Sequence, residues 1–215
     1  MHNLLLYFLS FLIPPTGNHY YSIASLNYDK ELISLIDSLY KEDKRVRLTD
    51  VSREEFLRVD SINLVKLTEL TKRYGHLLGV RDLDFESMKN YETLITHQQS
   101  EMILEIWNDK ILAGISDGDL DPERYADIID IAIFHRFKII NAKPAVDYSR
   151  YGNSTFQLDN QSFSYPVKDV EKADKLRREI GVPPLKYHLE ELGITYDVEA
   201  YKRWLESMGM QLIEE

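Results

Sequence analysis

The chain of 215 residues contains no cysteine. This absence excludes disulfide bonds, thiolate nucleophiles and sulfur-ligated zinc or iron sites together. The sequence also has no Gly-rich phosphate loop, no His-x-x-x-His or His-Glu metal spacing, and no serine or threonine in a recognisable nucleophile elbow. We therefore predict no bound metal and no cofactor. The absence of cysteine does not determine the cellular compartment, because a cysteine-free chain folds equally well in reducing and oxidising surroundings.

Positive charge is scarce as well. The 26 Lys and Arg residues are outnumbered by 36 Asp and Glu residues, which gives a formal net charge of −10. The field of such an acidic protein repels phosphate backbones and anionic lipid surfaces. Nucleic acid is therefore excluded as an expected partner. The hydrophobic fraction of 44% is enough for one core, so one domain is the default expectation.

One apolar run is present at the start of the chain, from Leu4 to Ile13, and Pro14-Pro15 follows it. The run is too short to span a bilayer but has the length of a signal-peptide hydrophobic region. Against export, no Lys or Arg precedes it. Three interpretations stay open: an export signal, an extension without function, or a first helix packed on the domain. We predict a leader over residues 1–28 outside the domain core, an exported protein if the leader is a signal peptide and a cytoplasmic one otherwise, and no stable membrane span.

Helical periodicity dominates the rest of the chain, with apolar residues at three- and four-residue spacing and cap residues at the expected helix starts. The period disappears before Pro166, where two short β-prone stretches flank Asp159-Asn160. The fold class predicted is mainly α, a single compact helical domain over residues 29–215 with a small β-hairpin near residues 154–165. The predicted helices span 29–47, 52–74, 84–111 with a kink near 97–100, 122–140, 168–179, 185–192 and 198–208.

Three polar residues in the first half are candidates for a site. Asp43 and Arg47 lie four positions apart, so on a helix they face each other as an acid-base pair. Such a pair is either a solvated surface pair or part of a site. His97 lies near the predicted helix junction, which suits a general base or a ligand-contacting imidazole as well as a capping role.

The helix predicted to start at Pro122 raises a question about one arginine. At about 100° per residue, Arg136 falls near the centre of the apolar face of this helix. A charge on a core-facing stripe needs an internal carboxylate, carbonyl groups or a bound anion. An internal ion pair and an anion clamp both stay open for Arg136.

Four acids suggest a metal site as a separate hypothesis. Paired acids on facing helices bind magnesium in all-helical nucleotide pyrophosphatases. The helical angles argue against such a site here, because they predict that all four acids lie on solvated faces. The acids in question are Glu101, Glu105, Asp127 and Asp130.

The last third carries a series of short motifs. Tyr151-Gly152 is followed by Asn153-Ser154, and Arg178 precedes Gly181-Val182 and Pro184-Leu185. Together with Thr96-His97 and Asp130-Ile131, this order resembles a widespread family of bacterial proteins of unknown function. Members of that family carry Gln-His, Asp-Arg, Tyr-Gly-Thr-Gln and Arg-x-x-Gly-Leu-x-Pro-Leu motifs, and an Asp and an Arg at the spacing of Asp43 and Arg47. The resemblance covers about residues 35–203, with Thr96, Ile131, Asn153-Ser154 and Val182 departing from the family pattern.

The resemblance implies that the matching residues share a pocket. We therefore expect His97 as a candidate catalytic residue, and Arg136, Tyr151, Arg178, Asp43 and Arg47 as ligand-binding residues. The first hypothesis is a binding or interaction domain for a small polar or anionic ligand or a protein partner. The alternative is a hydrolase-like enzyme with His97 as general base and an Arg that holds the substrate anion. A magnesium-dependent all-α nucleotide pyrophosphatase is the third hypothesis.

Overall fold

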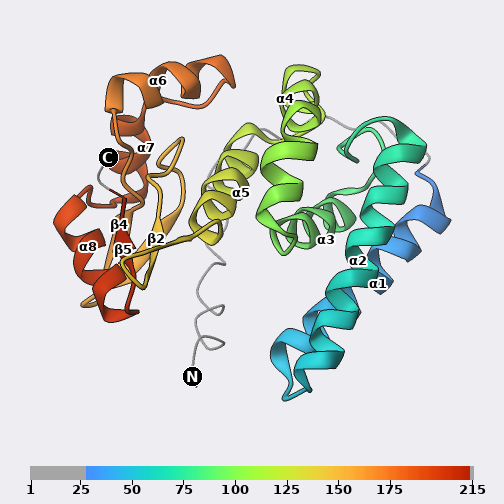
Figure 1. Ribbon diagram of the computed structural model, residues 1–215. Helices are drawn as coiled ribbons and strands as arrows, with labels where there is room; N and C mark the ends of the chain where they lie inside the picture. Colours follow the sequence, from blue (N-terminus) through green and yellow to red (C-terminus); the bar gives the residue numbers. More distant parts are fainter. Residues whose placement is uncertain (1–27, 214–215) are drawn as a thin grey trace.

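The computed structural model describes residues 28–213. This part of the chain folds into eight α-helices, one π-helical turn and five short strands (Figure 1). The mainly α class predicted from the sequence is confirmed. The helices are α1 Lys30–Leu48, α2 Arg53–Tyr74, α3 Phe85–Thr96, η1 Met102–Trp107, α4 Asn108–Ser116, α5 Pro122–His135, α6 Val170–Glu179, α7 Leu185–Leu192 and α8 Val198–Ser207, and the strands are β1 Lys138–Ile140, β2 Lys143–Val146, β3 Thr155–Leu158, β4 Gln161–Ser164 and β5 Gln211–Leu212.

The first helices begin and end where the cap residues predict. Asp29, Ser52 and Asp84 each accept hydrogen bonds from backbone N–H groups in the first turn of α1, α2 and α3. Gly75 ends α2 in the left-handed conformation, with φ of 79°. Short polar side chains at these positions satisfy N–H groups that the helix itself leaves without partners.

The predicted kink after Thr96 is present. The chain leaves the α-helical conformation at His97, the C-cap of α3, and resumes as the π-helical η1 before α4. The kink places the His97 side chain at a helix end, where it reaches residues of α1.

The helix predicted to run from 122 to 140 is shorter than expected. α5 ends at His135, and β1 and β2 follow as an antiparallel hairpin with Lys138 opposite Ala145. Asn141 and Ala142 form its turn at φ of 51° and 62°, a conformation that suits a two-residue hairpin loop and not a continued helix. β5 pairs in parallel with β2, so the sheet order is β1-β2-β5. This sheet was not predicted from the sequence, because apolar residues continue past the helix end.

The hairpin predicted near residues 154–165 is confirmed. β3 and β4 pair antiparallel, with Thr155 opposite Ser164 and Leu158 opposite Gln161. Asp159 and Asn160 form the turn at φ of 50° and 62°, as two-residue hairpin loops require.

Among the described residues, buried apolar side chains form three clusters. The largest is built mainly from α1–α5, with Trp107 and Tyr125, and also includes Tyr151 of the loop after β2. The second is aromatic: Phe156 stacks on Phe163 and on Trp204 of α8, and Phe134 of α5 packs against this cluster. In Figure 1, α5 lies between α1–α4 on one side and the strands with α6–α8 on the other. α5 therefore contributes to the packing of both parts.

Within residues 28–213, no helix combines the length and the apolar character needed to cross a bilayer. The leader predicted over residues 1–28 falls almost entirely on residues 1–27, which lie outside the described part.

Candidate functional site

The carboxylate of Asp43 is the centre of a polar cluster between α1, α2 and α3. Its Oδ2 lies 2.7 Å from Nδ1 of His97, and its Oδ1 accepts a hydrogen bond from the Asn63 amide at 3.2 Å. Nη1 of Arg47 lies 3.0 Å from the same Oδ1, as an ion pair without an aligned hydrogen bond. Nη2 of Arg47 binds Asp60 at 2.9 Å. We call these five residues the Asp43 cluster.

Three of the six residues expected at a site therefore meet here. Asp43 and Arg47 do form the pair that their spacing predicts, but it is not a solvated pair, because their side chains are 1% and 13% exposed. The Arg47 guanidinium also lies 4.8 Å from the centre of the Phe56 ring. Partial burial strengthens such contacts relative to a surface ion pair.

The Asp43 carboxylate sets the orientation of the His97 ring. When Asp43 is ionised, its carboxylate only accepts hydrogen bonds, so a neutral His97 ring carries its proton on Nδ1 and this N–H donates a hydrogen bond to Asp43. Nε2 is then the nitrogen that is able to take up a second proton. Two carboxylates and one guanidinium leave this cluster with a charge of −1 while His97 is neutral, and an imidazolium balances it.

The pKa values of one group inside the Asp43 cluster and one beside it are shifted. Burial raises the pKa of Asp60, and the charge of Arg47 opposes this shift. Desolvation lowers the pKa of His135, at the end of α5, and the charge of His97 lowers it further. His135 therefore lies close enough to His97 for their charges to interact.

A second polar cluster surrounds the loop from Arg150 to Asn153. Asp130 of α5 is completely buried and accepts hydrogen bonds from the backbone N–H groups of Arg150, Tyr151 and Asn153 at 2.8, 2.9 and 2.7 Å. Burial raises the pKa of Asp130 to about 6, against the three N–H donors, which lower it. The Asp130 carboxylate therefore fixes the shape of this loop.

A buried arginine of α6 also holds the loop from Arg150 to Asn153. It is Arg177, whereas the sequence predicted Arg178. Arg177 is completely buried; its Nη1 donates to the Tyr151 carbonyl at 2.8 Å and to the Asn153 side chain at 3.3 Å. Arg178, the predicted ligand-binding residue, is exposed on α6. The family-like spacing pointed to Arg178, whereas the helical spacing of Ala173, Arg177 and Ile180 marks the buried face.

Tyr151 belongs to this loop and not to the Asp43 cluster. It is 3% exposed and packs in the largest apolar cluster. Its backbone N–H and carbonyl groups bind Asp130 of α5 and Arg177 of α6, whereas Nδ1 of His97 contacts Asp43 of α1. The two expected site residues are thus held by different parts of the fold.

The burial expected for Arg136 is wrong. α5 ends one residue before it, so the helical angle no longer applies, and its side chain is 47% exposed. Arg136 is paired as expected, because its Nη2 binds Glu105 at 2.7 Å. The partner is itself an exposed carboxylate, so no bound anion is needed to neutralise Arg136.

The prediction that four acids lie on solvated faces holds for only two of them. Glu101 and Glu105 are exposed, but Asp130 is buried and Asp127 accepts hydrogen bonds from Ser154 and Arg124. Asp127, whose side chain is 24% exposed, and the fully buried Asp130 thus bind the 150–154 segment. Across residues 28–213, no group of three or more His, Asp or Glu side chains is arranged to hold a metal ion.

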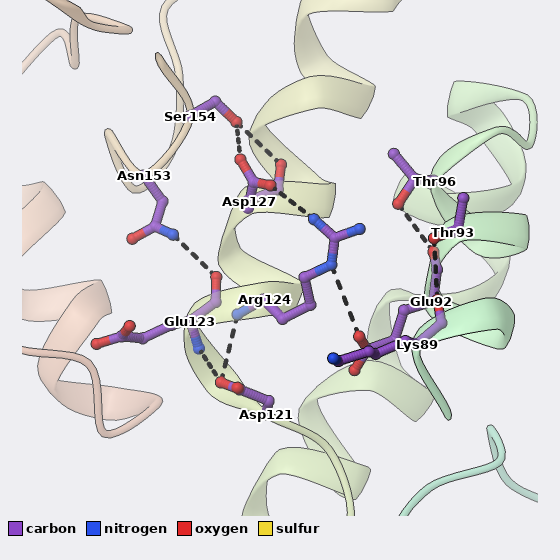
Figure 2. Close-up of polar contacts among 10 residues, drawn as sticks. All are labelled: Lys89, Glu92, Thr93, Thr96, Asp121, Glu123, Arg124, Asp127, Asn153 and Ser154. Atoms are coloured by element: carbon purple, nitrogen blue, oxygen red, sulfur yellow. Dashed lines mark hydrogen bonds and ion pairs between the residues drawn. The ribbon is translucent and has the colours of Figure 1, made fainter. Parts of the chain in front are cut away.

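Figure 2 shows how Arg124 joins α3 to this segment. Its Nη1 binds Asp127 at 3.0 Å, and its Nε lies 3.7 Å from Glu92 of α3. Burial raises the pKa of Glu92 to about 7, while the charge of Arg124 lowers it. This chain of contacts continues to Ser154, which donates to Asp127. It is a packing contact between elements, not an open pocket.

Several residues of both clusters could not be predicted from the sequence. Asn63 reaches Asp43 and Asp60 reaches Arg47 only through the packing of α2 on α1, and tertiary packing likewise places His188 near Arg177. The helical position of Arg177 is the one signal that could have found it. Comparison of the chain with protein-family models, with curated proteins and with solved structures found no match. The resemblance to a bacterial family thus stays a prediction.

Proposed function

We propose that the chain is a hydrolase-like enzyme in which His97 is the general base and Asp43 holds its ring. The observation that carries the proposal is the 2.7 Å contact between Nδ1 of His97 and the fully buried carboxylate of Asp43. Nothing in helix formation or core packing requires a buried carboxylate to hold a half-buried imidazole. The same arrangement is typical of catalytic histidines, whose second nitrogen accepts the proton.

In the proposed reaction, Nε2 of His97 removes a proton from water as the water oxygen attacks the substrate. The bond to the leaving group then breaks, and the imidazolium returns its proton to that group. Asp43 stabilises the imidazolium in between, because the negative charge of the cluster is then balanced.

The charges of the cluster also favour one class of substrate. Both terminal nitrogens of Arg47 already lie at ion-pair distance from carboxylates, so the charge of this arginine is compensated within the cluster. With a charge of −1, the cluster repels a phosphate ester more than an uncharged one. We therefore propose an uncharged ester or amide as the substrate, in place of the anionic ligand first expected.

The test is hydrolysis of p-nitrophenyl acetate and of p-nitrophenyl phosphate by the purified full chain. His97→Gln should reduce the rate with the acetate ester by about 10²–10⁴-fold, and Asp43→Asn by about tenfold or more. His76→Gln is the matched control, because His76 contacts Asp82 at 2.9 Å in a separate His-Asp pair.

Equal rates for His97→Gln and His76→Gln would overturn the enzymatic proposal. If a polar compound then binds the wild-type chain and not the His97 variant, the non-enzymatic binding domain becomes the better account. A preference for p-nitrophenyl phosphate would contradict the charge argument alone.

A further inference from the structure

The charge of Arg177 has no ion-pair partner within residues 28–213. Its hydrogen bonds go to neutral acceptors, namely the carbonyls of Pro183 and Tyr151 and the side-chain oxygen of Asn153. Nη2 of the same guanidinium is buried and has no hydrogen-bond partner among the described residues. A buried cation without a counterion is costly, often by several kcal/mol. This pattern suits a guanidinium that receives an anion.

His188 of α7 supplies a second polar atom of this kind. His188 is 7% exposed. Its hydrogen bond with the Asn153 backbone raises its pKa, which is the effect of a ring N–H that donates to the carbonyl oxygen. Its Nε2 is buried and, in the described part of the chain, has no hydrogen-bond partner. Burial and the nearby charge of Arg177 together lower the pKa of His188 to about 4. Arg177 and His188 therefore lie close together, and both contact Asn153.

None of the surrounding carboxylates forms an ion pair with Arg177 within residues 28–213. Burial lowers the pKa of Arg177, and the charges of Asp130, Asp174 and Glu123 raise it, in that order. Asp130 binds the loop N–H groups, and Asp174 accepts the N–H of Leu185 at 2.7 Å. Each of these acids acts on Arg177 from beyond ion-pair distance, since none of the ion pairs within residues 28–213 includes Arg177.

We propose that Arg177 and His188 form a binding site for a small oxyanion of the carboxylate or phosphate type. Nη2 of Arg177 donates to one of its oxygens in a charge-assisted hydrogen bond. The negative charge of the bound anion raises the lowered pKa of His188, so that Nε2 takes up a proton on binding and donates to a second oxygen. The turn between α6 and α7 lies next to the site, because the Pro183 carbonyl accepts a hydrogen bond from Nε of Arg177. The site shares no residue with the Asp43 cluster and does not depend on the proposed hydrolysis.

Isothermal titration of the full chain with inorganic phosphate and with acetate tests the proposal. Saturable binding of at least one anion is expected for the wild type. Arg177→Gln and His188→Gln should weaken it about tenfold or more. Arg178→Gln is the matched control, because it removes the same charge from the adjacent, exposed position and should leave the dissociation constant unchanged.

Circular dichroism of each variant shows whether it folds, because Arg177 also holds the loop. If Arg177→Gln does not fold, His188→Gln decides, since it leaves the contacts of Arg177 to Tyr151 and Pro183 intact. The proposal is overturned if neither anion binds the wild type saturably. It is also overturned if folded His188→Gln binds the anion as tightly as the wild type does, because the binding then occurs elsewhere on the surface.

Discussion

Asp130 and Arg177 hold the same loop through opposite polar groups of its backbone. The carboxylate accepts the N–H group of Tyr151, and the guanidinium donates to the carbonyl of the same residue. Asn153 is shared in the same way, through its N–H group and its side-chain oxygen. α5 and α6 are thus joined by two buried charges that do not contact each other, with the loop between them.

Removing the Asp130 carboxylate should destabilise the fold strongly. Asp130→Ala leaves three buried N–H groups without their acceptor, so we expect the free energy of unfolding to fall by about 3–5 kcal/mol. Urea denaturation measures the change. Glu101→Ala, an exposed acid, should stay within about 0.5 kcal/mol of the wild type. A loss below about 1 kcal/mol for Asp130→Ala would mean that the loop finds other acceptors.

Stability should fall as the pH rises through the range in which Glu92 ionises. The folded-state pKa of about 7 lies above the ordinary value of 4.5, so the folded protein binds the proton more tightly than the unfolded chain does. The stabilisation is present below pH 4.5 and is lost toward pH 7, by at most about 3 kcal/mol. The raised pKa of Asp130 acts in the same direction. Urea denaturation between about pH 5 and 8 gives the free energy of unfolding at each pH. This free energy should fall less steeply with rising pH for Glu92→Gln than for Glu86→Gln, an exposed control on the same helix.

Two arginine substitutions should differ in effect because of burial alone. Arg136 is 47% exposed and pairs with an exposed acid, so Arg136→Leu should change the free energy of unfolding by less than about 1 kcal/mol. Arg177 is completely buried, and Arg177→Leu leaves the Tyr151 carbonyl and other acceptors without a donor. We expect a loss of about 1–3 kcal/mol, because buried acceptors lose their donor while the cost of burying an unpaired charge disappears. Thermal denaturation of both variants checks the order, and an equal loss would contradict the assigned burial.

Gly152 should tolerate alanine less well than Gly181 does. Both glycines have positive φ, of 69° and 78°, so both substitutions strain the backbone by about 1 kcal/mol. A Cβ at Gly152 would also lie 3.0 Å from Leu185 and 3.2 Å from Val167, while a Cβ at Gly181 meets nothing within 4 Å. The melting temperature should therefore fall further for Gly152→Ala. Equal shifts would show that the neighbours of Gly152 move aside.

The sequence by itself determined the helices with clear caps and the second hairpin. Asp29, Ser52 and Asp84 mark helix starts through contacts within one turn, and Asp159-Asn160 marks the β3-β4 turn. These signals are local, so a pattern reports them. The end of α5 was misplaced because apolar residues continue into β1, and only pairing with β2 shows that they form a strand.

The polar clusters depended on the tertiary structure in a different way. The i,i+4 spacing predicts that Asp43 faces Arg47, but it does not predict that Asp43 is buried or that His97, 54 positions later, lies against it. The choice between Arg177 and Arg178 was likewise decided by which side of α6 packs on the loop. Spacing along a helix fixes relative angles, whereas burial and contacts between distant residues depend on the neighbouring elements that cover each face.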